Sequence, residues 1–565
     1  MLKCPLNPAL LLKMSSQLLA TQHRPALGLI TAFSLLHLLL AGQVNLSVDE
    51  AHYALYGLKL DWSYFDHPPM VGWLNALPAH LLPSDLGMRL IPIALYALSN
   101  WLLYRITLRL FSHPKHPQAP WLGFWALVLL NSGIMMQLLS QSMLPDAPLM
   151  LFALLTLWQT LNLRQTPSLK NWALLGLWLG LAGLSKYTAI TLVFSLILLV
   201  LIERRWTWFH WRYQPHNAGL LGFFTAIIIA SLLISPVLYW NAQHDWLSIL
   251  YQLNHGTYNP DWQWSRLIQS QAAQMLVYNP ILYLIALYLM LTLSFKTKPD
   301  QATANTRLLA LFALPVVLLF ALNSGYEMTL PHWTQLAWLF MTPAVTFWLW
   351  THWQQKIWRH LTLSLTTLSL ALTTLLLSHL FTPWIPFPAG QNPVQELHGW
   401  PQALQQAQTY QQQWAKPHHQ PPLFAANWTQ ASRIAWYGRP QAAYVTDNRF
   451  DQFDLWFGNP PAGSDGIVII PNYESSLKSF QQLTQPNPKR QQTPPPGQFE
   501  QCQTLPSLTL NYRPLLTHKT QRLVEYHYFY CQNYQPPHYS GWVNQLPNLT
   551  KWLPNNMTIP HEKSH

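Results

Sequence analysis

Long apolar segments recur along the chain as far as residue 381, with short polar loops between them. A helix of roughly 20 apolar residues crosses the hydrocarbon core of a bilayer, which is about 30 Å thick. We therefore predict an all-α polytopic membrane domain of about 11 transmembrane helices at residues 1–382. The predicted spans are 26–42, 88–110, 121–140, 143–162, 171–184, 187–202, 217–239, 275–294, 307–322, 332–350 and 360–381.

The pattern changes after residue 382, where Gln, Pro, Asn and aromatic residues surround short apolar stretches. Some of these stretches have the spacing of amphipathic helices, and others have the short or alternating pattern of strands. We predict a small α/β domain at residues 383–565. Its expected helices are 399–414, 429–437 and 473–483, and its expected strands are 422–426, 466–470 and 522–530.

The composition excludes an ordinary soluble enzyme, because 50% of the residues are apolar and 9% are charged. The net charge of +12 comes mostly from alternate loops of the membrane part, where anionic membrane lipids favour basic residues. No nucleic-acid-binding motif accompanies this charge. We expect membrane lipids as partners and no nucleic acid.

The loop charges predict an orientation. Sixteen of the twenty Lys and Arg residues before residue 382 fall in one alternating set of loops, which the positive-inside rule places in the cytoplasm. The N-terminus is then cytoplasmic and the C-terminal domain lies outside. Nine of the eleven acids before residue 382 fall on the outer side. Either an active site or plain solvation of the outer loops accounts for them.

The exported domain contains two cysteines, Cys502 and Cys531. In an oxidising compartment they could close a loop of about 30 residues, worth roughly 3 kcal/mol in the chain-entropy model. We predict a disulfide between them, with two free thiols as the alternative.

Three groups of ionisable residues mark the outer edge of the membrane domain. Asp49 and Glu50 follow the first span, Asp146 begins the fourth and Lys186 follows the fifth. A lysine can hold a phosphate as a point charge, and a carboxylate can deprotonate an incoming hydroxyl. The set predicts transfer chemistry on a phosphorylated lipid. Helix capping by Asp49 and Asp146 and snorkelling by Lys186 are the structural alternatives.

Several ordered motifs resemble bacterial glycosyltransferase family 39. These integral-membrane enzymes have the C-type fold and are related to protein O-mannosyltransferases and to the aminoarabinose transferase of lipid A. The likeness covers most of the membrane domain. The motifs are Asp49-Glu50-Ala51-His52-Tyr53, Ser63 to Met70, Leu144-Pro145-Asp146, Gly180 to Tyr187 and Ser235 to Trp246, with weaker matches at Gly399-Trp400-Pro401 and Phe450 to Phe457.

The resemblance implies an inner-membrane enzyme that moves one sugar from a polyprenyl-phosphate carrier to an envelope acceptor on the periplasmic face, with inversion. The acceptor would be lipid A, a polysaccharide or a protein. Asp49 matches the first-loop aspartate, the candidate base, and Glu50 beside it would hold the acceptor or a water. Asp146 matches the second acidic position and Lys186 a basic residue near the carrier phosphate.

Further substrate-binding candidates follow from the same resemblance. Tyr64 and His67 match a Tyr-Phe-acid-basic-Pro stretch, and both His52 and His67 stand where the aminoarabinose relatives have Arg or Lys. Histidine is only partly charged near neutral pH, which weakens a specific claim for aminoarabinose. Packing beneath the following prolines is the alternative. His244 and Asp245 lie on the loop after the seventh span, where sugar or acceptor contact competes with an ordinary aromatic belt.

No cofactor is predicted with certainty. A divalent metal held by Asp49, Asp146 and a histidine is conceivable, although no close ligand spacing supports it. Two other functions stay open. A lipid-linked sugar flippase should show broken spans around polar residues at the bilayer midplane, and a surface-glycan ligase should carry arginines outside instead of the acid pair.

Overall fold

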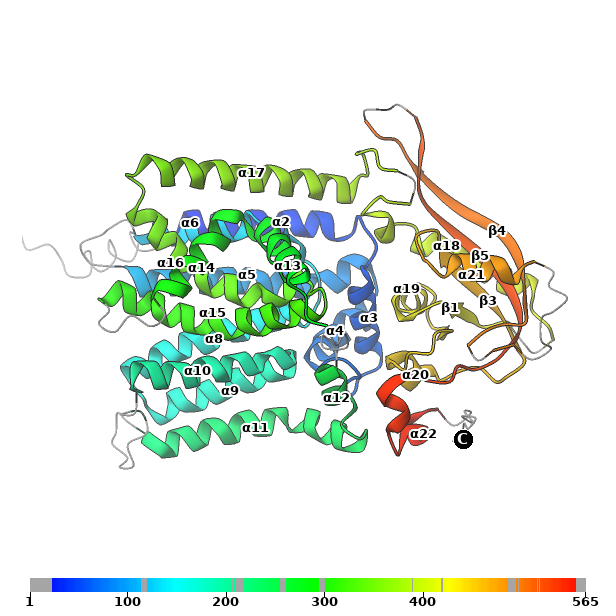
Figure 1. Ribbon diagram of the computed structural model, residues 1–565, viewed down its shortest axis with the longest axis horizontal. Coiled ribbons are helices and arrows are strands. Elements are labelled where there is room, and N and C mark those ends of the chain that lie inside the picture. Colours follow the sequence, from blue (N-terminus) through cyan, green and yellow to red (C-terminus); the bar gives the residue numbers. More distant parts are fainter. Residues whose placement is uncertain are drawn as a thin grey trace, which may run out of the picture. The chain divides into compact units, whose positions relative to one another are not determined.

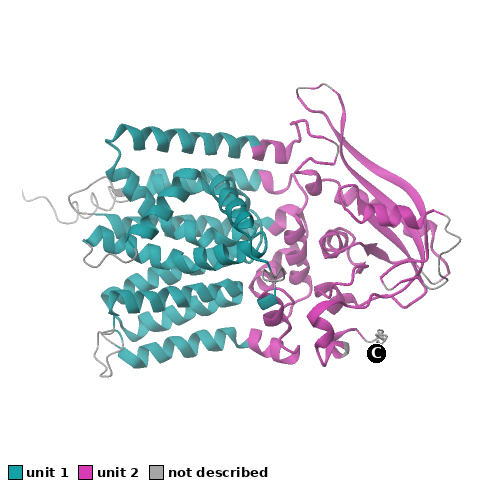
Figure 2. Ribbon diagram, viewed as in Figure 1, with its two compact units in different colours: residues 1–39, 89–235, 253–375 teal, residues 40–88, 236–252, 376–565 magenta. Residues whose placement is uncertain are grey.

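The computed structural model describes residues 23–554 except 113–118, 206–207, 209–217, 255–260, 294–299, 389, 418–419, 486–493, 496, 516 and 518. The chain divides into two compact units (Figure 2). The first comprises residues 1–39, 89–235 and 253–375, and the second comprises residues 40–88, 236–252 and 376–565. Two segments that the domain prediction gave to the membrane part, 40–88 and 236–252, thus belong to the same unit as the C-terminal domain.

Each predicted span coincides with a helix, or with two helices separated by a short break (Figure 1). Long apolar helices satisfy their own backbone hydrogen bonds, which lipid cannot do for them. The helices are α2 (Arg24–Ala41), α5 (Asp85–Phe111), α6 (Ala119–Asn131), α7 (Ile134–Leu139), α8 (Asp146–Gln165), α9 (Leu169–Ser185), α10 (Ile190–Glu203), α11 (Gly219–Gln243), α13 (Trp264–Tyr278), α14 (Pro280–Leu293), α15 (Gln301–Tyr326), α16 (Gln335–Thr351) and α17 (Lys356–Phe381).

Fewer helices are long and apolar enough to cross a membrane than the eleven predicted. Among the described residues, five pass by length and composition, or six if the bent pair of α13 and α14 is counted as one span. This pair turns by 119° at Asn279, whose φ is 91°. The following residue is Pro280, and a residue before proline disfavours the helical region. The chain is a multi-pass membrane protein, and eleven crossings stay a prediction.

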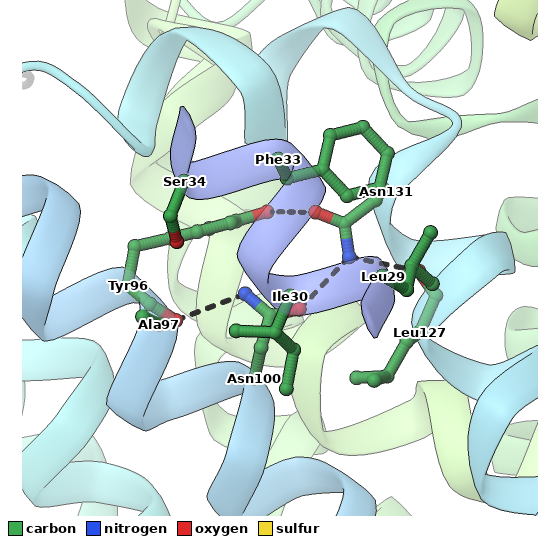
Figure 3. Close-up of a pocket in the computed structure, with 9 residues that line it drawn as sticks. All are labelled: Leu29, Ile30, Phe33, Ser34, Tyr96, Ala97, Asn100, Leu127 and Asn131. Carbon is green, nitrogen blue, oxygen red and sulfur yellow. Dashed lines mark hydrogen bonds between the residues drawn. The ribbon is translucent and has the colours of Figure 1, made fainter. Parts of the chain in front are cut away.

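A polar network joins α5 and α6 inside the first unit, beside a small hollow lined partly by α2 (Figure 3). The Tyr96 hydroxyl donates to Asn131 at 2.7 Å, and the Asn131 amide donates to Asn100 at 2.8 Å. The Asn100 amide donates in turn to the Tyr96 carbonyl. Hydrogen bonds of this kind join helices where no water is at hand, so we assign the network to helix packing.

The second unit contains a five-stranded mixed sheet with the strand order β2-β1-β3-β5-β4. The first three of these are mutually parallel, and β5 is antiparallel to both β3 and β4. The predicted strands correspond to β1, β3 and β5, whereas β2 and β4 were not predicted. The strands are β1 (Leu423–Ala425), β2 (Ala443–Val445), β3 (Ser464–Pro471), β4 (Gln501–Tyr512) and β5 (Gln521–Tyr534).

The three helices predicted for the C-terminal domain correspond to α18, α19 and α21, and the short α20 was not predicted. The second unit also contains α3 and α4, which come before the sheet in the sequence, and most of α12. The helices are α3 (Val48–Leu58), α4 (Met70–Leu81), α12 (Leu247–Asn254), α18 (Trp400–Gln413), α19 (Trp428–Tyr437), α20 (Gln452–Phe457), α21 (Leu477–Leu483) and α22 (Leu549–Trp552).

One hydrophobic core explains why α3 belongs to the second unit. Ala51 and Leu55 of α3 are buried in the same cluster as Trp400, Ile434 and Tyr526. Burial of apolar side chains contributes about 25 cal/mol per Å², so this shared core fixes α3 against the C-terminal helices. The first outer loop of the sequence is therefore a packed part of a folded domain.

A disulfide joins the last two strands. Cys502 of β4 lies directly opposite Cys531 of β5, and the structure bonds their sulfur atoms. Both side chains are buried in a small cluster that also contains Phe499 and Phe529. The crosslink closes the β4–β5 hairpin at the end far from its turn.

Candidate active-site clusters

The acid pair lies at the start of α3. Ser47 is the N-cap residue, and its hydroxyl accepts the Glu50 amide, while the Glu50 carboxylate accepts the Ser47 amide at 3.0 Å. This reciprocal arrangement is a capping box. Glu50 is buried and Asp49 is partly exposed. The side chain in the capping box is thus that of Glu50 and not that of Asp49. Asp49 is the member of the pair that solvent reaches.

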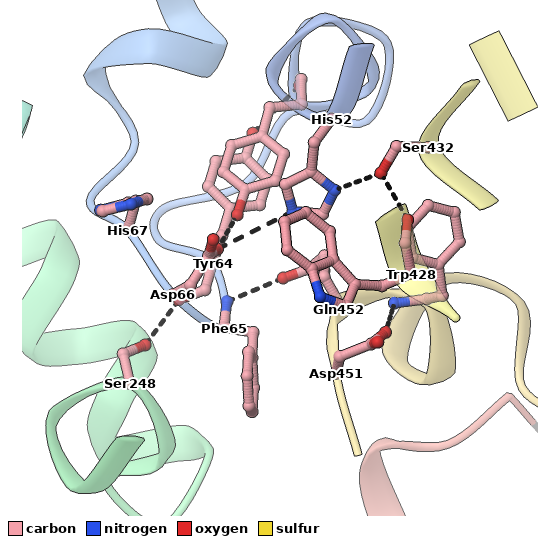
Figure 4. A network of polar contacts seen from close by, with 12 residues as sticks. His52, Tyr64, Phe65, Asp66, His67, Ser248, Trp428, Ser432, Asp451 and Gln452 are labelled. Atoms are coloured by element: carbon pink, nitrogen blue, oxygen red, sulfur yellow. Dashed lines mark hydrogen bonds and ion pairs between the residues drawn. The ribbon is translucent and has the colours of Figure 1, made fainter. Parts of the chain in front are cut away.

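His52 lies one turn further along α3, inside a cage of aromatic rings (Figure 4). Its Nε2 is 3.9 Å from an Asp66 carboxylate oxygen, and its Nδ1 is 3.2 Å from the Ser432 hydroxyl. Only 3% of His52 is exposed. The surrounding rings are those of Tyr53, Tyr56, Trp428, Phe453 and Trp456. A side chain so enclosed can reach a substrate only through its neighbours.

Asp66, which was not among the predicted site residues, lies beside His52. Burial by itself raises the pKa of Asp66, but the charge of His67, the charge and proximity of His52, and a hydrogen bond from the Tyr56 hydroxyl together hold the pKa below its ordinary value. The carboxylate therefore stays ionised near neutral pH. The signal that could have found it is its position inside the motif Ser63 to Met70, directly before His67.

The loop carrying Asp66 is fixed by two other segments of the second unit, α12 and α20. The Phe65 amide donates to Gln452 at 2.7 Å, and the Ser248 hydroxyl donates to the Tyr64 carbonyl at 2.6 Å (Figure 4). The Gln252 amide donates to the Asp66 carbonyl at 2.5 Å. A loop held at so many points is preorganised, which is the condition for precise placement of catalytic groups.

Tyr64 and His67 close this loop. Tyr64 is fully buried and stacks on Tyr56, and its hydroxyl lies 3.0 and 3.1 Å from the carbonyls of Tyr56 and Lys59. The Tyr64 amide donates to the His67 carbonyl at 3.1 Å. The packing alternative accounts for Tyr64, and its contact with substrate stays a prediction. His67 lies edge-on to Tyr53.

His244 and Asp245 make contacts within the second unit. The His244 ring stacks on Trp240, whose indole donates to Asp61 at 2.9 Å. The Asp245 carboxylate accepts the backbone amide and the side-chain amide of Asn548 at 3.1 and 2.9 Å. The Asp245 contacts fix the segment around Asn548. They do not test the predicted sugar contact of His244 and Asp245.

The first unit brings two predicted residues together. The Lys186 ammonium lies 2.8 and 2.9 Å from the two carboxylate oxygens of Asp146, and the Gln335 amide donates to Asp146 at 2.6 Å. All three side chains are buried. Asp146 stands in the first turn of α8, and Lys186 stands where α9 ends in extended backbone. Removing either charge would leave the other buried without its partner.

This pairing changes the chemistry expected of both residues. A carboxylate that accepts hydrogen bonds from an ammonium and an amide is a poor general base. Lys186 can still contribute to a phosphate site, provided that Asp146 orients it. Within the described residues, no group of three or more His, Cys, Asp or Glu side chains is arranged to hold a metal ion.

Comparison with known proteins supports the predicted family. The dolichyl-phosphate-mannose-protein mannosyltransferase family matches residues 66–240. The lipid A galacturonosyltransferase RgtD of Rhizobium johnstonii is 24% identical over 353 residues, which are 61% of this chain and 68% of that protein. These matches support the predicted membership of glycosyltransferase family 39. The protein is a glycosyltransferase, as predicted.

Two solved structures share the fold of this chain. ArnT from Cupriavidus metallidurans in the apo state matches with a TM-score of 0.53 and 13% identity, over 81% of this chain and 94% of that one. The same protein bound to undecaprenyl phosphate matches with a TM-score of 0.52 and 13% identity, over 80% of this chain and 94% of that one. The C-type fold is confirmed by this likeness.

Proposed function

We propose that this protein transfers one sugar from a polyprenyl-phosphate carrier to an acceptor of the bacterial envelope, with inversion at the anomeric carbon. The reaction takes place at the periplasmic face of the inner membrane, with the N-terminus in the cytoplasm. The match of residues 66–240 to the dolichyl-phosphate-mannose-protein mannosyltransferase family carries the proposal. It is supported by a relative named for transfer to lipid A and by a shared fold whose solved example binds undecaprenyl phosphate.

Asp49 is the proposed catalytic base. It stands partly exposed in the first turn of α3 beside the buried Glu50, which fixes the start of that helix. A carboxylate held by a rigid helix end can take the proton of an acceptor hydroxyl as the oxygen attacks the anomeric carbon. Glu50 acts on the reaction by holding the start of α3.

The glycosyl phosphate brings its own leaving group. A single base therefore suffices, in contrast to the paired catalytic carboxyls of most glycoside hydrolases. Positive charge must offset the charge that grows on the departing phosphate. We assign this role to Lys186, oriented by Asp146. His67 and His52 remain proposed substrate-binding residues.

A transfer assay tests the proposal. Purified protein is incubated with radiolabelled polyprenyl-phosphate sugar and with envelope fractions containing lipid A, polysaccharide or exported protein. Label should move to one fraction, the free carrier phosphate should appear in equal amount, and the new glycosidic bond should have the opposite anomeric configuration. Movement of intact donor across a vesicle membrane without a glycosylated product would indicate a flippase instead.

The acceptor is identified in cells. Envelope fractions from a deletion strain and its parent are compared by mass spectrometry, and one class of molecule should lack the mass of a single sugar. A strain expressing the Asp49→Asn variant should show the same loss. A loss of whole oligosaccharides would favour a surface-glycan ligase and contradict the transfer of a single sugar.

A further inference from the structure

A cluster of positive charge lies at the other end of the helices that carry the Asp146–Lys186 pair. Glu203, the last residue of α10, is buried, and Arg164 and Arg205 approach its two carboxylate oxygens at 3.2 and 3.0 Å. Arg307 of α15 lies 3.7 Å from the oxygen that Arg164 contacts. Arg164, Arg205, Arg307 and Glu203 are called the arginine cluster below.

The positive charges of the arginine cluster outnumber its negative charge. Guanidinium groups stay protonated in proteins, so three positive charges face one carboxylate. The side chains of Arg164 and Arg307 are 13% and 10% exposed, so the like charges around Glu203 repel one another with little solvent to screen them. Nearby, Arg109 of α5 donates to Asn162 in the last turns of α8 and adds a further positive charge. Asp300 caps α15 but is itself exposed.

The position of the arginine cluster points to the membrane boundary. Arg164 lies in the last turn of α8, which begins at Asp146 and has 20 residues. A helix of that length spans about 30 Å, the thickness of the hydrocarbon core. Figure 1 shows α8, α9 and α10 side by side in the first unit. The arginine cluster therefore stands where lipid phosphates lie, at the end that the loop charges assign to the cytoplasm.

An apolar stripe leads along α10 to the arginine cluster. Exposed side chains recur at helical spacing on one face of this helix and stop just before Glu203. They are Ile190, Val193, Phe194, Ile197 and Leu201. An acyl chain can lie along such a stripe while its headgroup reaches the guanidinium groups, which a free inorganic anion cannot do.

We propose that Arg164, Arg205 and Arg307 bind the phosphate of an anionic membrane phospholipid, whose acyl chain lies on the exposed face of α10. Guanidinium groups form paired hydrogen bonds with phosphate oxygens, and the bound anion supplies the negative charge that Glu203 alone does not provide. This site is separate from the proposed transfer site, and either can fail without the other.

Native mass spectrometry of the purified full-length protein tests the site. Protein is titrated with phosphatidylglycerol and, separately, with zwitterionic phosphatidylcholine. Wild-type protein should bind phosphatidylglycerol more tightly, and Arg164→Gln or Arg307→Gln should weaken this binding about tenfold, because each removes a charge-assisted contact. Lys356→Gln, which removes an exposed charge at the start of α17, is the control and should change little. Equal binding by wild type and both arginine variants overturns the proposal.

Glu203→Gln gives an independent measurement. Gln has nearly the same shape but no charge, so the arginine cluster would gain positive charge and phosphatidylglycerol should bind several-fold more tightly. Unchanged or weaker binding would contradict the site. Inorganic phosphate serves as the soluble competitor. If it displaces phosphatidylglycerol at equal concentration, the acyl chain contributes nothing and the lipid site on α10 is wrong.

Discussion

The ammonium of Lys186 lies between both carboxylate oxygens of Asp146, at 2.8 and 2.9 Å, in the buried interior of the first unit. Two residues with separate predicted roles are thus one ion pair. Substitution of either one changes the environment of the other.

The first prediction concerns the stability of this pair. Asp146→Asn should lower the free energy of unfolding by about 3 to 5 kcal/mol, because it leaves a buried ammonium without its counter-charge. The double variant Asp146→Leu with Lys186→Met should lose less than Asp146→Asn alone, since no charge is then buried. Thermal unfolding in detergent measures both. Asp146→Leu and Lys186→Met are also measured singly, and if their losses simply add in the double variant, the residues are not coupled.

The second prediction concerns donor binding by Lys186, measured apart from stability. Lys186→Ala should weaken donor binding, measured by titration with a polyprenyl-phosphate sugar. Lys170→Ala removes an exposed lysine from the start of α9 and should leave donor affinity unchanged. Unchanged affinity in a folded Lys186→Ala protein would remove the assignment of Lys186 to the carrier phosphate.

Asp49 and Glu50 give a matched pair of variants. Asp49→Asn should lower turnover by a factor of about 10² to 10⁴, the range for loss of a general base, without a loss of stability. In Glu50→Gln the amide oxygen can still accept the Ser47 amide, so the capping box and turnover should largely persist. Initial rates and unfolding temperatures are measured for both. Equal loss of turnover in the two variants would contradict the assignment of Asp49 alone as base.

The pH dependence of stability follows from two acids around α20, Asp454 and Asp447. Burial raises the pKa of Asp454 to about 7 and that of Asp447 to about 6, from an ordinary value of 3.8. The folded state thus keeps protons that the unfolded chain releases above about pH 4. Their contribution to stability is full below that pH and is lost as the pH rises to about 7.

Asp454→Asn tests this dependence. The substitution removes the group that must lose its proton, so the fall in unfolding temperature between pH 5 and pH 8 should become smaller than in wild type. Asp465→Asn is the control. The pKa of Asp465 is lowered, because hydrogen bonds from Lys416 and Tyr530 outweigh its burial. Its contribution changes below pH 4, and the fall from pH 5 to pH 8 should be unchanged.

The membrane helices could be predicted because lipid imposes long apolar runs, and every predicted span has a helix at its position. The short elements could not. Strand β2 has three residues, and β4 is largely exposed and mixes polar with apolar residues, so neither has a clear periodicity. The packing of α3 against α19 joins residues nearly 400 positions apart, a distance over which periodicity gives no information.

For the site residues, too, one part could be predicted from the sequence and another could not. Sequence motifs indicated which segments carry chemistry, but hydrogen-bond partners depend on the fold. Glu50 turned out to complete a capping box, and Asp66, which was not selected, lies beside His52. A residue type and its spacing predict what a side chain can do. They do not predict which of its possible partners it meets.

The last prediction concerns Cys502 and Cys531. These residues are 29 positions apart and face each other across β4 and β5. Their crosslink restricts the unfolded chain, so Cys502→Ser with Cys531→Ser should lower the free energy of unfolding by about 2 to 4 kcal/mol. Protein from an oxidising compartment should gain two alkylated cysteines after reduction, as read by mass spectrometry. The same alkylation count with and without reductant would show two free thiols, and the stability difference would then need another cause.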